Sequence, residues 1–219
     1  MNRNGLLSVL LVLSLAGVLA GCGVVPWVTN TIFGRNEKVK PKYEFPKGKT
    51  LLVFVESDPA LNYLAGVELV RVSLANVIGE QLVENQAVAS YVSQNRLQNV
   101  LEQLPELASI GEVGQRCGAD FVLYVQIEQL SFQDVPNTTL YTGRMQTAVK
   151  VIDVTQGKVF PPVEAKYPLK EIKLTPTDDT SPTYTNVIAK VLAIKMGDNI
   201  AKLFYEHELP KNGDPMLME

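Results

Sequence analysis

The sequence has very little of the chemistry that enzymes use. Its only histidine, His207, lies between two glutamates near the carboxyl end, whereas a zinc site needs three or four converging ligands. No G-x-S-x-G segment occurs, and a lone histidine in such a position does not favour a Ser-His-Asp triad. Gly111, Gly114 and Gly118 fit neither phosphate-binding glycine pattern. We therefore expect no catalytic residue, no cofactor and no metal site, and a protein that is not an enzyme.

Two further polar features have ordinary explanations. His207 is expected at the end of the last helix, as a solvated side chain that the helix dipole favours. The adjacent acids Asp178 and Asp179 could suggest paired catalytic carboxylates, but they stand in a loop rich in Thr and Pro. Adjacent acids in such a loop are expected to be solvated, and they do not indicate general acid catalysis.

Cysteine is almost absent, and the first of the two cysteines ends a distinctive segment. Arg3 gives a positive start, residues 6–18 form an uncharged apolar run, and Leu19-Ala20-Gly21-Cys22 follows. This is the layout of a secretory signal. A transmembrane anchor would need about 20 apolar residues, and the Gly and Cys residues at 21–23 interrupt the run. An ordinary secretory signal remains a possible reading of the same residues.

The ending of this segment resembles the lipobox of bacterial lipoproteins. The resemblance implies that the Cys22 thiol receives diacylglycerol, that residues 1–21 are removed as a signal peptide, and that the new amino terminus is acylated. Two or more chains hold a protein stably in a bilayer. Cys117 would then be the sole free thiol, so no intramolecular disulfide is possible. It is expected to be a buried structural cysteine rather than a reactive one.

Charge divides the rest of the chain into two parts. Residues 22–49 hold six basic and two acidic side chains, and residues 50–219 hold 13 basic and 21 acidic ones. Binding of nucleic acid needs clustered Lys and Arg on the domain, so an acidic domain argues against that partner. The basic segment, which contains three prolines and no sustained period, is read as a tether. Its charges could touch anionic lipid headgroups or could only keep the tether solvated.

Hydrophobic periodicity predicts the elements of the domain. A continuous apolar run at 50–55 indicates a strand buried on both faces, and apolar residues at spacings of three and four predict a helix over 67–85. A short strand at 88–92 and a helix over 94–104 follow. Ser109 and Glu112 have the form of a capping box, which predicts a helix from there to Cys117, and Gly118 is placed as its C-terminal cap.

The second half of the domain is predicted to be richer in strands. Residues 121–132 and 140–154 form two long strands, and the clean alternation of the second implies a sheet with one wetter face. Residues 155–158 are expected to turn into a strand at 159–160. Residues 163–182 are expected to hold an edge strand and a loop. Ser181 and Pro182 then start the last helix, whose apolar stripe is Tyr184, Ile188, Leu192, Met196, Ile200 and Leu203.

Together these elements predict an α/β (α+β) fold with a mixed sheet of about five strands and helices packed on it, in the order β-α-β-α-α-β-β-β-α. The predicted organisation is a signal peptide at 1–21, a lipid anchor and basic tether at 22–49, a globular domain at 50–206 and a polar tail at 207–219. Residues 50–219 are expected to fold without the tether.

The segment from Ser109 to Gln126 carries a second resemblance. A helix ends in Gly118-Ala119-Asp120 and leads directly into an apolar strand, and a second long strand finishes in the phrase at 151–157. This is similar to the superfamily of the curli-secretion lipoprotein CsgG, the TolB amino-terminal domain and the lipoprotein activators of murein synthases. The resemblance implies a non-enzymatic α/β module for binding and assembly at the cell envelope.

The sequence therefore predicts a lipoprotein held in the bacterial envelope through Cys22, with other envelope proteins or further copies of itself as partners and no nucleic acid. The residue after the lipidated cysteine is Gly23 and not Asp, which by the sorting rule of enteric-type bacteria implies the outer membrane, facing the periplasm. A CsgG-like secretion channel is the alternative. It would need long amphipathic hairpins, and the short, proline-containing segment 155–182 does not favour them.

Overall fold

The computed structural model describes residues 38–105, 108–132, 143–161, 169–173 and 184–208. Cys22, Asp178, Asp179 and the predicted helix start at Ser181 and Pro182 lie outside these residues. The chain divides into one unit at residues 40–207 and a smaller one made of residues 1–39 and 208–219. All that follows concerns the larger unit unless another is named.

One mixed sheet organises the unit. Its strands β3 (Ser90–Tyr91), β2 (Thr50–Ser57), β4 (Phe121–Ser131) and β5 (Arg144–Asp153) lie side by side in that order. The first three run parallel, whereas β5 is antiparallel to β4. β6 (Val159–Phe160) and β7 (Leu169–Lys173) both pair with β5, at opposite ends of its outer edge. The predicted mixed sheet with helices packed on it is confirmed.

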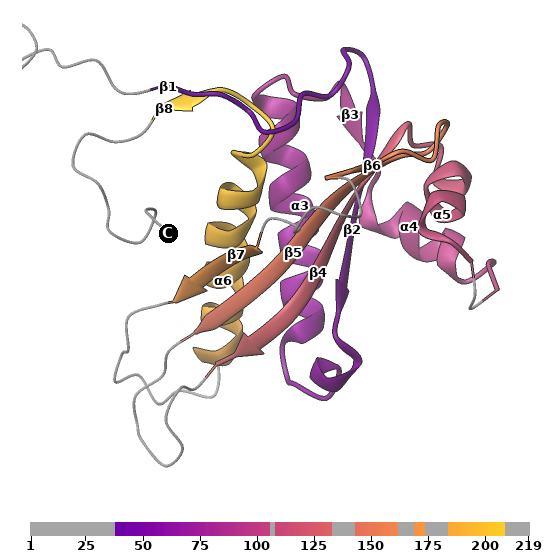
Figure 1. The fold of residues 1–219 in the computed structure, drawn as a ribbon. Coiled ribbons are helices and arrows are strands. Elements are labelled where there is room, and N and C mark those ends of the chain that lie inside the picture. Colours follow the sequence, from indigo (N-terminus) through magenta and orange to yellow (C-terminus); the bar gives the residue numbers. More distant parts are fainter. Residues whose placement is uncertain (1–37, 106–107, 133–142, 162–168, 174–183, 209–219) are drawn as a thin grey trace, which may run out of the picture. The chain divides into compact units, whose positions relative to one another are not determined.

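Two long helices cover one face of the sheet. α3 (Val67–Glu84) and α6 (Tyr184–Ala201) each have 18 residues, and both lie on the same side in Figure 1. The predicted stripe of α3 is buried, as are four predicted residues of α6: Ile188, Leu192, Met196 and Ile200. These side chains pack on the inward residues of the central strands, such as Leu123 and Val125, and form the larger core.

Two short helices cover part of the other face. α4 (Gln94–Leu101) and α5 (Ile110–Cys117) lie on the opposite side of the sheet from α3 and α6 (Figure 1). They enclose a second, smaller core that includes Leu52, Val122 and Cys117. α4 ends at Leu101, three residues before the predicted position. After Leu101 the chain forms turns in which backbone hydrogen bonds join residues three apart. Pro105 disfavours a helical conformation of the residue before it, so the helix does not continue.

The caps of α5 are those that the sequence predicts. The Ser109 hydroxyl accepts a hydrogen bond from the Glu112 N–H at 3.2 Å. Gly118 takes the left-handed conformation with φ of 74°, which an L side chain rarely adopts. The Ala119 N–H then donates to the Gly114 carbonyl at 2.9 Å, so the helix ends in a closed turn and the chain enters β4 directly.

Both ends of the predicted domain differ from expectation in their packing. Phe45, inside the predicted tether, is buried and contacts Phe121 and Phe204, with ring centroids 5.6 and 5.3 Å apart. At the other end, His207–Glu208 form the short strand β8 where the sequence predicts a polar tail, and Lys38–Val39 form the strand β1 of the smaller unit. The pattern of the sequence gave no sign of these contacts, since the residues around Phe45 are polar or proline. The boundaries drawn from the sequence stay predictions.

Candidate functional site

The face of the sheet that α4 and α5 cover only in part is the candidate functional site. On β4 the residues of that face change from buried Val122 and Tyr124 to half-buried Gln126 as the strand leaves the two helices. Figure 1 shows α4 and α5 beside the start of β4 only. We call the remaining part, which no described helix covers, the open face. Its residues are Glu56, Tyr124, Gln126, Gln129, Gln146, Ala148 and Lys150.

The register of the strands places these side chains together. Gln126 is opposite Ala148 on β5, and Tyr124 is opposite Lys150. A bulge after Ile127 shifts the pairing by one residue, so that Gln129 then lies opposite Gln146. Because alternate residues of a strand point to opposite faces, Thr147 and Val149 belong to the covered face. The alternation of β5 confirms the wetter face that the sequence predicts.

A charged and aromatic cluster marks the border between the covered and the open part. The Tyr124 hydroxyl donates a hydrogen bond to a Glu56 carboxylate oxygen at 2.5 Å. The Lys150 ammonium lies 4.4 Å from the centre of the Tyr124 ring, and Phe54 contacts the same ring edge-on at 6.0 Å. Such a cation over an aromatic face is attractive. The four side chains come from three neighbouring strands and fix one another in place.

Electrostatics keep Tyr124 protonated. Burial raises the pKa of the Tyr124 hydroxyl far above its ordinary value, and the hydrogen bond to Glu56 and the negative charge of that carboxylate raise it further. A neutral phenol that donates to a carboxylate is a fixed recognition group, not a base. The cluster therefore presents hydrogen-bonding groups and a positive charge at the border of the open face.

The neighbouring edge of the sheet is protected against a further strand. Beyond β3 the outer carbonyl groups of β2 accept hydrogen bonds from side chains: Gln94 Nε2 donates to the Val53 carbonyl and Arg71 Nε to the Val55 carbonyl, both at 3.2 Å. Strand edges with satisfied backbone groups do not recruit other chains. Binding is therefore expected on the open face and not at this edge.

The Gly118-Ala119-Asp120 phrase is structural. Asp120 accepts hydrogen bonds from the Thr50 N–H at 2.8 Å and from the Lys49 ammonium at 3.0 Å, and its own N–H donates to the Thr50 carbonyl. The bond from Thr50 and, after it, the bond from Lys49 lower the pKa of the Asp120 carboxyl. Asp120 thus joins the starts of the parallel strands β2 and β4, which explains why this residue follows the helix cap.

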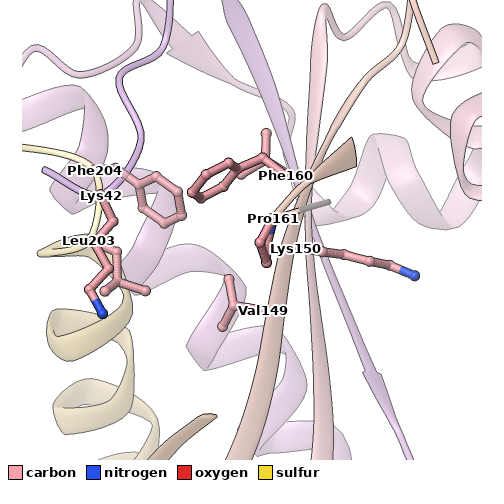
Figure 2. A pocket seen from close by; sticks show the side chains of 8 residues that line it. Lys42, Val149, Lys150, Phe160, Pro161, Leu203 and Phe204 are labelled. Atoms are coloured by element: carbon pink, nitrogen blue, oxygen red, sulfur yellow. The ribbon is translucent and has the colours of Figure 1, made fainter. Parts of the chain in front are cut away.

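A pocket at the β5 edge is too small for a substrate. Figure 2 shows its lining, which is almost entirely apolar: Val149, Val151, Phe160, Pro161, Leu203 and Phe204, with the stems of Lys42 and Lys150. The Lys150 amine points away from the pocket. The cavity is about 10 Å³, space for one water molecule. It is a gap in the packing beside the core.

The other residues singled out by the sequence show no chemistry. His207 lies in β8, six residues after α6 ends at Ala201, so its predicted place at a helix end is wrong. The chain turns at Leu203 and Phe204, which pack into the core. Cys117 is buried and free, and burial raises the pKa of its thiol, as expected for a structural cysteine. Among the described residues no group of His, Cys, Asp and Glu could hold a metal ion.

Within the ranges that the structure describes, no helix is both long and apolar enough to cross a bilayer.

Comparisons with known proteins return similar solved structures only. No protein-family model matches the chain, and no curated protein matches it. Lipoprotein GNA1162 from Neisseria meningitidis is 12% identical, with a TM-score of 0.42 over 68% of this chain and 99% of that one. The PelC dodecamer from Paraburkholderia phytofirmans is also 12% identical, with a TM-score of 0.39 over 79% and 99%.

The LpoB C-terminal domain from Escherichia coli is 18% identical, with a TM-score of 0.32 over 58% of this chain and 83% of that one. Such likenesses concern the fold alone and do not identify a function.

Sequence reasoning missed the central residues of the site. Glu56 follows one apolar run, and Tyr124 lies inside another. The sequence of one strand does not show which residues of a neighbouring strand lie beside it. The parallel register of β2 and β4, with Phe54 opposite Tyr124, is what brings them together. Lys150 was visible only as a polar position in an alternating strand.

Proposed function

We propose that this chain is a lipid-anchored bacterial envelope protein that acts as a non-enzymatic binding or assembly factor. Cys22 holds it in the outer membrane with its domain in the periplasm, and the open face binds a partner protein of the envelope. The observation that carries the proposal is a sheet face left uncovered by the described helices, with a fixed Glu56, Tyr124 and Lys150 cluster at its border.

The chemistry of the open face suits a folded protein as partner. Glutamine side chains, one carboxylate, one ammonium and an aromatic ring lie together on one face of the sheet. Interfaces between proteins combine such aromatic and polar groups, whereas small molecules are bound in concave sites of several hundred Å³. The cavity of about 10 Å³ at the β5 edge does not meet that need.

The test of binding is photo-crosslinking in intact cells. A photoreactive phenylalanine analogue at Gln146, on the open face, should give one or a few defined crosslinked proteins after irradiation. The matched control places the same analogue at Gln98, an exposed residue of α4. Equal crosslinking from both positions, or none from Gln146, would contradict the proposal. A crosslink between two copies of this chain would favour self-association instead of a different partner.

The test of anchoring is Cys22→Ser. We expect a radioactive fatty acid to label the unchanged protein only, and the variant to remain an uncleaved or soluble precursor. Separation of the two membranes on a density gradient should place the unchanged protein in the outer-membrane fraction. Equal labelling of the variant would exclude Cys22 as the acceptor, and recovery with the inner membrane would overturn the proposed location.

A further inference from the structure

The outward side of α6 carries an apolar stripe that no described residue covers. Val187 and Ile194 are 48% and 54% exposed, and half-buried Val191 lies between them at spacings of four and three. The opposite side of the same helix is fully buried in the core. A helix with apolar residues on all sides is normally covered on all sides. We therefore expect another molecule or surface to cover the stripe at 187, 191 and 194.

The charges around the stripe are positive. Lys190 and Lys195 are exposed, and neither makes an ion pair with any residue that the structure describes. The acidic residue of this side, Asp198, is neutralised by the Lys202 ammonium at 2.5 Å. The stripe is therefore an apolar surface with two lysines, which complements an anionic partner.

The neighbouring helix adds no net charge at the level of the stripe, because its exposed Glu68 pairs with the Arg71 guanidinium at 2.8 Å. α3 and α6 run in the same direction, because a Cβ on Gly66 would lie 3.7 Å from the Ala189 Cβ and a Cβ on Gly197 would meet Val77. The outward residues of α3 at that level, Leu69 and Ser73, are uncharged.

We propose that this stripe rests on an anionic lipid surface. Apolar side chains enter the headgroup region while lysines beside them contact lipid phosphates. A second copy fits less well, because a two-fold contact centred on Val191 would bring the Lys190 residues of both copies together, and like charges repel. The domain would thus lie against the membrane through α6 and present the open face, on the other side of the sheet, to the periplasm.

The length of the chain before the domain permits this contact. The inference rests on the proposed lipid at Cys22, and 15 residues lie between Cys22 and Lys38, the first described residue. That segment spans at most about 55 Å if fully extended. A weak contact suffices under such tethering, because the anchor keeps the effective concentration of the surface high.

The test uses the chain from Cys22 to Glu219, coupled through the Cys22 thiol to a maleimide lipid in vesicles. Cys117 is buried and should not compete. Trp27→Phe removes the one native tryptophan, and Ile194→Trp then reports contact with phosphatidylglycerol that carries brominated chains. We expect its quenching to exceed that of Gln98→Trp, the control on α4, by about two-fold or more. Val187→Trp provides a second probe on the same stripe.

Charge removal separates a specific contact from general attraction. Lys190→Gln with Lys195→Gln should reduce the quenching at 194 to the control level, whereas Arg96→Gln with Arg116→Gln removes the same charge from α4 and α5 and should leave it unchanged. Quenching equal at 194 and 98 would overturn the inference. So would a concentration-dependent dimer without vesicles that buries residue 194, since the occupant would then be a second copy.

Because the lipid is attached chemically, this result does not depend on lipidation in the cell. A failure here and a failure of the Cys22→Ser test are therefore distinguishable.

Discussion

The two faces of the sheet are built from the same strands and do different things. On one face, two helices of 18 residues bury every inward side chain of the central strands, from Leu51 to Ile127. On the other, two helices of eight residues cover only the start of β4, and the burial ends at Tyr124. The first face stabilises the domain, whereas the second is only partly covered by the described helices.

Under the proposed function, the difference separates the residues that stabilise the domain from those that bind a partner. Thr147 is the one buried polar side chain among the described residues, and its hydroxyl donates a hydrogen bond to the Met196 sulfur at 3.4 Å within the larger core. One residue further along the same strand, Ala148 belongs to the open face. Substitutions on β5 should therefore have effects that alternate residue by residue.

The largest effect is expected for Phe45→Ala, at the border of the covered face. The Phe45 ring contacts three aromatic rings of the domain, those of Tyr43, Phe121 and Phe204. Its removal should lower the free energy of unfolding by about 3–5 kcal/mol. Chemical denaturation measures this free energy. A chain that begins at residue 50 should be less stable than one that begins at residue 40 by a similar amount. Equal stability of the two truncated forms would show that residues 40–49 are only a tether.

A slightly smaller effect is expected for Leu123→Ala on β4. The side chain is fully buried in the larger core, and a Leu to Ala change at such a site costs about 2–5 kcal/mol. Urea denaturation followed by circular dichroism gives the value. A loss under about 0.5 kcal/mol, typical of surface positions, would mean that β4 is not the central strand of the core.

Tyr124→Phe tests the border cluster. Loss of the hydrogen bond to Glu56 should cost about 1 kcal/mol, because the carboxylate is partly exposed and finds water. The raised pKa of Tyr124 also sets the direction of the pH dependence. The pKa of Tyr124 is higher in the folded state than its unfolded value of about 10. Its contribution to the free energy of unfolding is therefore fully present below about pH 10 and is lost as the pH rises above that value.

Tyr124→Phe should therefore lose less stability between neutral and alkaline pH than the unchanged protein. Thermal unfolding at pH 8 and above pH 10 compares the two. An equal alkaline loss in both would assign it to another group.

The sequence predicted the fold well because its signals are local. Apolar periodicity located both long helices, and Ser109 and Gly118 placed the ends of α5 through the backbone chemistry of single residues. Contacts between distant segments carry no such signal. The burial of Phe45 depends on the distant rings of Phe121 and Phe204. The contact between Glu56 and Tyr124 depends on the parallel register of β2 with β4, which no single strand encodes.

Candidate chemistry was predicted less well than the fold. The sequence predicts His207 at the end of the last helix, but α6 ends at Ala201, and the apolar pair Leu203 and Phe204 packs into the core after it. The open face was visible only as the alternation of β5. Its extent follows from the short length of α4 and α5, and the sequence does not say which strands two short helices will cover.

Ala148→Glu tests the central claim most directly, because it changes the open face beside Gln126 without entering either core. The free energy of unfolding and the crosslinking from the analogue at Gln146 are measured on the same variant, with Val149→Glu as the control on the covered face. We predict that Ala148→Glu changes stability by less than about 0.5 kcal/mol and abolishes the crosslinks, while Val149→Glu prevents stable folding. An Ala148→Glu variant that folds normally and retains every crosslink would contradict the account.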